Sequence, residues 1–330
     1  MGHYLAFPNL NINVFTLDSV AFKLFGRDVM WYGVIITLAI ILGVIYVMYR
    51  AKQEKLLEDD VYDYALIVVL TAIVFARLYY VVFDPTPNYK SFIDVIAIWE
   101  GGLAIYGAII GGALAVFGVC KWKKVYFARF ADIVCPAVML GQAIGRWGNF
   151  MNGEAYGSVE KFDFLFVSFD ISNATLTSPF LMIVDGVRAL PTFFFESVWN
   201  VIGFVLICTV INRHRKFAGA NTLFYFAWYG FGRMFIEGLR TDSLYIPGSD
   251  TLRVSQLIGV LTFVFATAAF VYLSIRAKKH PFDPKSPVYY GARLEKLKAE
   301  GFIADTCKDE PQDLDINEEN KQEKTKEKEE

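Results

Sequence analysis

The sequence is poor in the residues that hold metal ions or build disulfide frameworks. Its 330 residues include only three histidines and four cysteines, and no two cysteines form a CxxC pair. The histidines stand near chain ends or in loops, which argues against a zinc site or a histidine base within the membrane. Most of the cysteines stand in or beside apolar segments, where packing is the expected role. These residues are Cys120, Cys135, Cys208 and Cys307, with His3, His214 and His280.

Residues 1–28 also lack the pattern of a cleaved signal peptide, a basic start followed directly by an apolar run. Long apolar and aromatic runs dominate the rest of the chain, which is 55% hydrophobic overall and contains 30 Phe and 18 Tyr. Several runs approach the roughly 20 residues that cross a bilayer as a helix. The expected fold is therefore an all-α polytopic membrane protein with seven spans, at roughly 30–49, 61–83, 102–120, 131–150, 193–211, 220–238 and 254–275.

Basic residues alternate along these spans. "RAKQEK" follows the first span, "KWKK" and Arg129 the third, "RHRK" the fifth and "RAKK" the seventh. The opposite connections carry few Lys or Arg, which by the positive-inside rule places the N-terminus outside and the C-terminus in the cytoplasm. No internal repeat is evident, which disfavours transporter folds built from inverted repeats.

The connections divide the chain into a seven-span domain, residues 1–280, and a charged cytoplasmic tail, residues 281–330. Between spans four and five, the segment 151–192 contains "FLFVSFDI" and turn residues, which predict a small extracytoplasmic domain with some strand. The segment 84–100 is expected to form an arm on the outer leaflet. Residues 305–330 hold 11 Asp or Glu and five Lys, so the tail is expected to be largely disordered and solubilising.

A polar stripe interrupts the end of span four, in "GQAIGRWGNFMNGEAYG". Gln142, Arg146 and Asn149 fall at i, i+4 and i+7 on one helix face, and Asn152 and Glu154 follow just past the helix end. An arginine inside the bilayer costs about 2.5–3.5 kcal/mol on the insertion scale, so it needs a function or a partner. One interpretation is an arginine that snorkels to the surface and pairs with Glu154; a polar pocket is the other.

A second stripe lies in "WYGFGRMFIEGLR" of span six. Tyr229, Arg233 and Glu237 stand at i, i+4 and i+8, and Arg240 follows at i+11. Arg233 and Glu237 alone would make an ordinary i,i+4 pair. Two spans with the same residue types at the same outer depth instead predict a shared pocket. Arginine binds phosphate bidentately, so the expected ligand is a phospholipid headgroup entering from the membrane.

Two further segments bear on this pocket. "WEGGLAIYGAIIGG" begins span three with glycines that predict helix–helix contacts at Gly107, Gly111 and Gly112. Tyr106 among them needs a hydroxyl partner once buried. "MWYG" begins span one, where Trp31 and Tyr32 are typical of an aromatic belt.

The motifs together resemble a known family. "GRWGNFMNGEAYG" resembles the signature of bacterial prolipoprotein diacylglyceryl transferases, and "WYG", "WEGGLAIYG" and "YGFGRMFIEGLR" resemble its other blocks in order, over roughly residues 1–280. The resemblance implies seven spans in the bacterial cell membrane. It also implies transfer of diacylglyceryl from phosphatidylglycerol to the lipobox cysteine of a secreted precursor, with release of glycerol phosphate.

The resemblance also assigns residues. It implies catalytic roles for Arg146, Arg233, Tyr106, Glu154 and Glu237. Phosphatidylglycerol binding is implied for Arg146, Asn149, Asn152, Gly157, Tyr32, Tyr229, Arg233 and Arg240. Asp132 and Glu196 match acidic positions that orient helices or arginines. One departure is that some members carry histidine where this chain has Tyr106.

The implied reaction displaces a phosphate monoester with a thiol, so it needs a thiolate, a stabilised leaving group and an aligned lipid carbon. The arginines would neutralise the phosphate, and the asparagines and tyrosines would hold the headgroup in line. The thiol's proton acceptor stays open among the departing phosphate, Glu154, Glu237 and a water held by Tyr106. Neighbouring arginines would raise the thiolate fraction by themselves.

Two other classes of protein compete with this interpretation. An anion transporter or channel would also place arginines in the membrane, but its polar residues would continue toward the cytoplasm. A lipid-binding scaffold would bind the headgroup without chemistry. The expected partners are phosphatidylglycerol, prolipoproteins with a lipobox cysteine and membrane lipids; no cofactor, metal or nucleic acid is expected.

Overall fold

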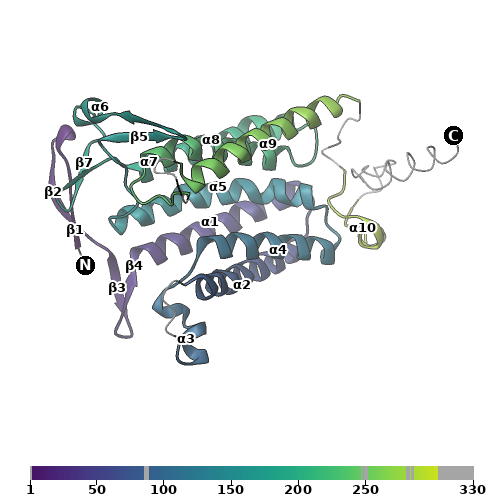
Figure 1. Cartoon of the computed structure of the whole chain (residues 1–330). Helices are drawn as coiled ribbons and strands as arrows, with labels where there is room; N and C mark the ends of the chain where they lie inside the picture. The colour runs from purple at the N-terminus through teal and green to yellow at the C-terminus, as the bar shows by residue number, and fades with distance from the viewer. Residues whose placement is uncertain are drawn as a thin grey trace.

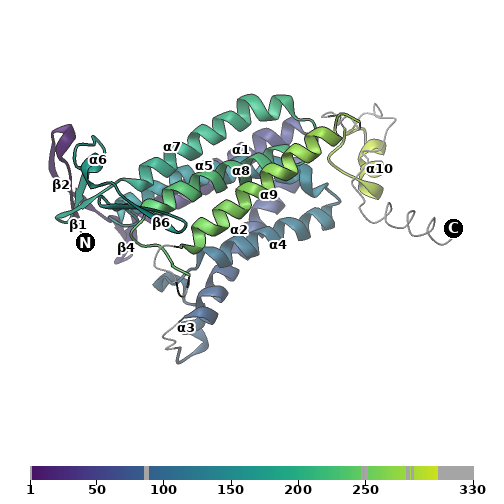
Figure 2. The ribbon, with the colours of Figure 1, turned by 45° about the horizontal axis from the view of Figure 1, so that its top comes forward.

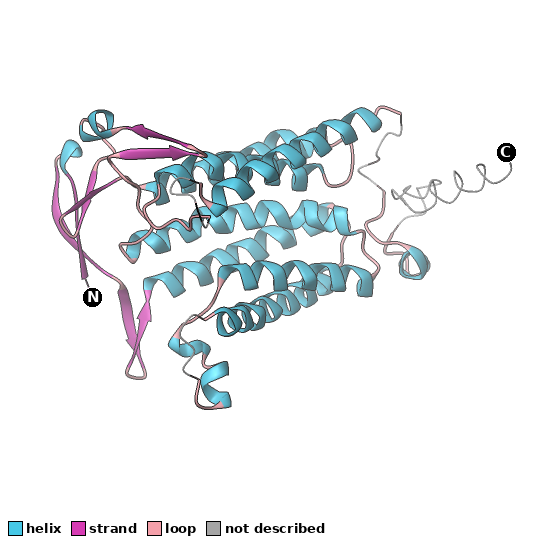
Figure 3. Cartoon of the chain, in the orientation of Figure 1, coloured by secondary structure: helices cyan, strands magenta, loops and turns pink. Residues whose placement is uncertain are grey.

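The computed structural model describes residues 2–84, 89–246, 248, 252–279, 283 and 286–303. Long helices lie side by side in one bundle, and the strands gather at one end of it (Figures 1 and 3). The short helix α10, Gly291–Ala299, lies at the opposite end in both ribbon views (Figures 1 and 2). The bundle therefore has an end rich in strands, where the predicted site residues lie, and an end near the C-terminus.

The long helices follow the apolar runs closely. In the part of the chain that the structure describes, six are long and apolar enough to cross a membrane. One of the six is the continuous helical run Thr192–His214, whose α-helical part is α7. A seventh helix, α8, has 17 residues and is shorter than each of these six runs. The predicted polytopic class is confirmed. The bounds are Trp31–Gln53 (α1), Glu58–Phe83 (α2), Ile105–Lys123 (α4), Phe127–Met151 (α5), Thr192–Leu206 (α7), Ala220–Ile236 (α8) and Val254–Arg276 (α9). A π-helical turn, Ile207–Ile211, continues α7.

Strands cover the end of the bundle where α5 and α8 finish. The main sheet has the order β2-β1-β7-β8, and two separate hairpins, β3–β4 and β5–β6, lie beside it. The strands are Gly2–Phe7 (β1), Ile12–Asp18 (β2), Val20–Leu24 (β3), Arg27–Met30 (β4), Lys161–Phe164 (β5), Val167–Asp170 (β6), Met182–Val184 (β7) and Val187–Ala189 (β8). A short helix, α6 (Ser172–Leu176), follows β6.

The main sheet joins two distant parts of the chain. Leu5 of β1 pairs with Val184 of β7, antiparallel. Leu5, Val184 and Phe193 are buried together beneath the sheet. The sequence pattern predicts strand only in residues 151–192 and does not predict β1 to β4. β1–β2 and β3–β4 are local hairpins, whereas the pairing of β1 with β7 joins residues nearly 180 positions apart, which no local pattern reveals.

Small residues bring α2 and α4 together. A Cβ on Gly107 would lie 2.3 Å from the carbonyl oxygen of Phe75, and one on Gly111 would lie 2.5 Å from the Phe75 Cβ. These two glycines permit the close helix contact that the sequence predicts. Gly112 differs, because a Cβ there would meet only an ordinary contact with Val68 at 3.9 Å.

The predicted outer arm contains α3, Phe92–Ile96, and a 3₁₀ turn, Ile98–Glu100. Residues 85–88 of this segment lie outside the described residues. Arg77 of α2 holds the arm, since its guanidinium donates to the backbone oxygens of Asp94, Val95, Gly101 and Gly102 at 2.7–3.0 Å. A buried arginine is thereby satisfied by backbone carbonyls.

The other end of the bundle is closed by residues 286–303. Tyr289 is fully buried, and its hydroxyl donates to Asp60 at 2.6 Å. Leu297 of α10 and Ile303 join the same buried cluster as Tyr289. The predicted tail from residue 281 thus begins with a packed segment in the part that the structure describes. The acidic residues 305–330 lie outside the described residues.

Candidate active site

Two arginines from different helices share one buried carboxylate. Glu196, in the first turns of α7, is 3% exposed. It forms an ion pair with Nε of Arg146 from α5, and its Oε1 accepts a hydrogen bond from Nη1 of Arg233 of α8 at 2.5 Å. The two guanidiniums that the sequence predicts in one pocket therefore meet at Glu196. Arg146 pairs with this residue rather than with Glu154, so the interpretation as a snorkelling Arg146–Glu154 pair is wrong.

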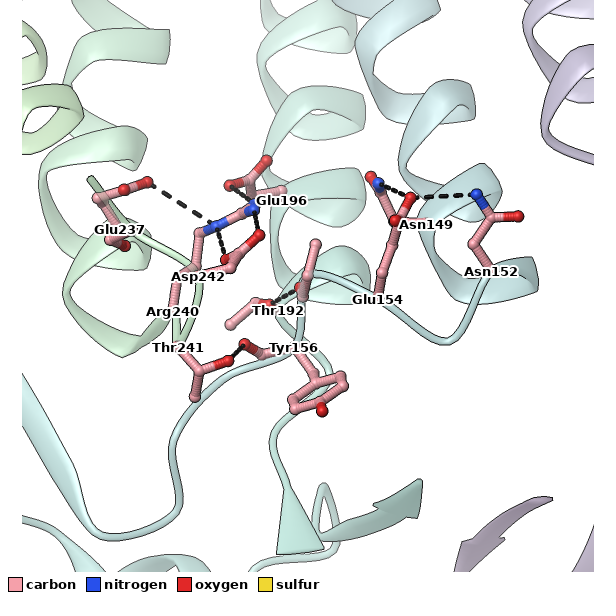
Figure 4. A network of polar contacts seen from close by, with 12 residues as sticks. Asn149, Asn152, Glu154, Tyr156, Thr192, Glu196, Glu237, Arg240, Thr241 and Asp242 are labelled. Atoms are coloured by element: carbon pink, nitrogen blue, oxygen red, sulfur yellow. Dashed lines mark hydrogen bonds and ion pairs between the residues drawn. The ribbon is translucent and has the colours of Figure 1, made fainter. Parts of the chain in front are cut away.

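A third arginine adjoins this group. Nη1 of Arg240 lies 4.0 Å from Oε1 of Glu196, and its Nε lies 4.0 Å from Oε2 of Glu237. Arg240 also binds Asp242 through two hydrogen bonds of 3.0 and 2.6 Å. Figure 4 shows Arg240 between these three carboxylates. Glu237, only 2% exposed, also pairs with Arg233 one helical turn earlier.

Charge and burial distinguish Arg146 within the cluster. The cluster contains three guanidiniums and three carboxylates, because Asp242 at the surface pairs with Arg240 and adds a third carboxylate to Glu196 and Glu237. Arg233 engages both terminal nitrogens, one with Glu196 and one with Glu237. Arg146 pairs with Glu196 through Nε, and among the described residues its two terminal nitrogens form no further ion pair. Its side chain is 21% exposed. Those two nitrogens form the planar fork that suits a phosphate.

The asparagines of the signature surround Glu154 at the end of α5. Asn149 and Asn152 donate from their side-chain amides to Oε1 of Glu154, at 3.1 and 3.2 Å (Figure 4). The Glu154 backbone N–H donates to the carbonyl oxygen of Asn149 at 3.1 Å. Glu154 is exposed. The turn therefore presents one oriented carboxylate to the outside of the protein.

Residues 155–157, which follow this turn, connect the end of α5 with the start of α7 and with the residues after α8. Gly157 exchanges backbone hydrogen bonds of 2.8 and 2.9 Å with Leu190, just before α7. The Thr192 hydroxyl donates to the carbonyl oxygen of Ala155 at 2.7 Å, and the Thr241 hydroxyl donates to that of Tyr156 at 3.1 Å (Figure 4). A Cβ on Gly157 would lie 2.8 Å from Cγ2 of Thr192, so this glycine permits close packing. Its role in lipid binding stays a prediction.

The predicted tyrosines occupy three different surroundings. The ring of Tyr32 packs over Gly148 of α5, where a Cβ would lie 2.6 Å from Cδ2 of the ring. Tyr229 stacks on Tyr225, whose hydroxyl accepts a hydrogen bond from Gln142 at 3.1 Å.

Tyr106 is separate from both. Its exposed ring lies 6.3 Å from that of Tyr79, on the face shared by α4 and α2. Among the described residues, no hydrogen bond or ion pair connects Tyr106 with the arginine cluster.

An arginine outside the predicted set supports the cluster from behind. Arg253 is 1% exposed and donates to the backbone oxygens of Glu237 and Arg240. It also binds Asp163 of β5 at 2.6 Å. Burial raises the pKa of Asp163, but hydrogen bonds from Ser168 and Arg253 and the charge of Arg253 outweigh it, so the net pKa lies below its usual value. The sequence pattern does not distinguish Arg253 from other loop charges, because its partner Asp163 stands 90 residues away.

The other acidic residue that the family motif marks lies at the start of α8. Asp132 of α5 is fully buried and accepts hydrogen bonds from the backbone N–H groups of Gly219 and Thr222, at 2.8 and 2.9 Å. A carboxylate that satisfies the free N–H groups of a helix start stabilises that start. Asp132 thus orients α8, the helix that carries Arg233.

Comparisons with known proteins agree with the motif. Residues 19–272 match the family model described as prolipoprotein diacylglyceryl transferase. A relative from Streptococcus uberis is 42% identical over 81% of this chain and 98% of its own length. Relatives from Finegoldia magna and Pediococcus pentosaceus are 42% and 38% identical, over 80% of this chain and 97% and 92% of their own lengths. All three carry the name phosphatidylglycerol–prolipoprotein diacylglyceryl transferase.

Proposed function

The chain belongs to the prolipoprotein diacylglyceryl transferase family, and from this premise we propose how its residues carry out the reaction. It is a membrane-embedded transferase that moves the diacylglyceryl group of phosphatidylglycerol to a prolipoprotein. We assign the acceptor to the cysteine thiol of a lipobox in a secreted precursor. The remaining proposals concern the arrangement in the membrane and the roles of the site residues.

The proposed arrangement has seven spans, with α8 as the sixth along the chain. Seventeen residues rise about 26 Å at 1.5 Å each, and the 3₁₀ turn Glu237–Leu239 lengthens the helix toward the roughly 30 Å of the hydrocarbon core. The alternation of basic flanks supports an N-terminus outside and a C-terminus in the cytoplasm. The arginine cluster then lies near the outer surface of the bacterial cell membrane, where secreted precursors arrive.

The proposed chemistry is one displacement. The precursor sulfur forms a bond to the terminal glycerol carbon of the diacylglyceryl group, and the bond from that carbon to the phosphate oxygen breaks. Glycerol phosphate leaves with the electron pair, while the thiol proton passes to an acceptor. The protein must therefore stabilise the leaving phosphate, align the carbon and admit the thiol.

Arg146 and Arg233 are proposed to stabilise the leaving phosphate. Glu196 fixes both guanidiniums, one by Nε and one by Nη1, so their positions are set before the lipid binds. The two terminal nitrogens of Arg146 are then available for the phosphate oxygens. A prearranged donor in a site with little water stabilises developing charge without reorganisation. This convergence of two guanidiniums from separate helices is the observation that carries the proposal.

Glu154 is proposed as the side chain that accepts the thiol proton. Glu237 is buried between Arg233 and Arg240, and Tyr106 lies on another face of the bundle. Glu154 is exposed and oriented by two amides, so an incoming precursor can reach it. Asn149, Asn152, Tyr32 and Tyr229 surround the same end of the bundle and are proposed to hold the headgroup.

One assay tests the function and separates it from its alternatives. The purified protein is incubated in phosphatidylglycerol vesicles with a lipobox peptide, and thioether and glycerol phosphate are measured. A transporter or a lipid-binding scaffold would yield neither product. Arg146→Ala and Arg233→Ala are expected to abolish transfer while membrane insertion is kept. The matched control is Arg188→Ala, an exposed arginine of β8. Activity retained in both cluster variants would refute the phosphate role.

A further inference from the structure

The turn that carries Asn152 and Glu154 is covered by a residue from the start of the chain. Gly153, between them, has a positive φ of +61°. A Cβ on Gly153 would lie 2.7, 2.8 and 3.0 Å from Cγ, Nδ1 and Cδ2 of His3. The imidazole ring therefore packs directly against the backbone of this glycine, and the space that a side chain would need is occupied by the ring.

The imidazole is itself held in place. Nδ1 of His3 lies 2.7 Å from Oδ2 of Asp185, in the turn between β7 and β8. The other Asp185 oxygen accepts a hydrogen bond from the Tyr4 backbone N–H at 2.8 Å, and the Asp185 backbone N–H donates to the Tyr4 carbonyl oxygen at 2.8 Å. These hydrogen bonds, with β1 paired to β7, fix the ring relative to the main sheet.

His3 lies outside the residues that the family model matches. The match covers residues 19–272, whereas His3 belongs to the β1–β2 hairpin that precedes it. Gly153 lies within the signature, between two residues that the proposed mechanism uses. The hairpin thus brings a side chain from outside the range of the family model to the turn that carries Asn152 and Glu154.

We infer that His3 is a positioning residue for the transfer reaction: it holds the Gly153 turn so that Glu154, oriented by Asn152, faces the acceptor thiol. Glycine at a positive φ has wide conformational freedom, and the packed ring restricts it. Once the turn is fixed, the Asn152 amide stays within 3.2 Å of the Glu154 carboxylate. The inference rests on the proposed function, and specifically on the role of Glu154.

The first test separates the turnover rate from lipid binding. His3→Ala removes the ring and is expected to lower kcat roughly 10- to 100-fold, the effect of moving a catalytic group by about 1 Å. The KM for phosphatidylglycerol is expected to change much less than kcat, because the arginine cluster does not contact His3 and Asn152 is the one proposed headgroup residue in this turn. His3→Phe loses the hydrogen bond to Asp185 but keeps an aromatic ring over Gly153. Because the ring is what restricts the turn, this variant is expected to retain most of the wild-type kcat. Equal losses in His3→Ala and His3→Phe would overturn the inference.

A double-mutant cycle tests the contact itself. Gly153→Ala is expected to be strongly impaired, because its Cβ would overlap the His3 ring. In the His3→Ala, Gly153→Ala double variant that overlap is absent, so the double variant is expected to be more active than Gly153→Ala alone. Additive losses would show that the two residues act independently and would overturn the inference.

Controls keep this result distinct from the proposed function. Val14→Ala changes an exposed side chain of the same hairpin, 67% exposed, and is expected to retain full activity. If wild-type protein forms no thioether from phosphatidylglycerol, the proposed function fails. If wild type is active and His3→Ala has the same kcat, only the positioning role fails. The kcat values are calculated per folded protein, and a fall in the kcat of His3→Ala that disappears after this correction would indicate general damage and would also refute the positioning role.

Discussion

Replacing Glu196 with glutamine removes the one charge that joins the arginines of three segments. The amide oxygen of Glu196→Gln can still accept a hydrogen bond from Arg233, and Arg233 keeps Glu237. Arg240 keeps Asp242 at 2.6 Å. Arg146 loses its only ion pair among the described residues. The loss therefore falls mainly on Arg146, the residue proposed to bind the phosphate.

The size of the effect depends on burial. Breaking a buried ion pair by removing one partner costs about 3–5 kcal/mol. The Arg146 side chain is 21% exposed, so water solvates part of its charge and the lower figure applies. About 3 kcal/mol corresponds to roughly a 100-fold change in an equilibrium constant. We therefore expect the thermal midpoint in detergent to fall by roughly 6–12 °C. Misplacing a catalytic group by about 1 Å costs roughly 100-fold in rate, so kcat/KM is expected to fall by about that factor as well.

The assay measures thioether formation at a temperature well below the variant's midpoint, so that loss of folded protein does not contribute. Glu160→Gln is the matched control, because Glu160 is an exposed carboxylate in the same outer region. That control is expected to match wild type in both measurements. A Glu196→Gln variant with the wild-type midpoint and the wild-type kcat/KM would refute the reasoning that Glu196 positions Arg146.

Three other substitutions probe residues around the cluster. Tyr106→Phe is expected to keep the wild-type transfer rate, because the ring lies against Tyr79 and away from the arginines; a large loss of rate would return the hydroxyl to the mechanism. Arg253→Ala is expected to destabilise the folded protein by about 3–5 kcal/mol, measured as a lower thermal midpoint, since it leaves Asp163 buried without its main partner; an unchanged midpoint would contradict this. The pKa of Asp163 lies below its usual value, so its contribution to stability is complete above pH ~4 and is lost as pH falls through the lower folded pKa. Asp163→Asn should therefore flatten the fall of the thermal midpoint in acid, and a slope equal to that of wild type would count against it.

Local spacing predicted the polar faces correctly but not their partners. Arg233 and Glu237 do form the i,i+4 pair that their spacing indicates. The spacing allows Arg146 to pair with Glu154, eight residues away, yet Arg146 pairs with Glu196, fifty residues away. Sequence spacing predicts which side chains are neighbours on one helix, but it does not predict contacts between different helices. Which helices meet depends on packing, as in the close contact of α2 and α4 at Gly107 and Gly111.

The sequence alone determined the membrane class, the positions of the long helices and the residues of the signature. Apolar length and helical periodicity are properties of consecutive residues, so they can be read along the chain. The tertiary structure decided that Glu196 is the common partner of two arginines, that Arg253 supports them, and that His3 lies on Gly153. These contacts join segments that the backbone separates widely, and they form only when the helices and the outer strands pack together.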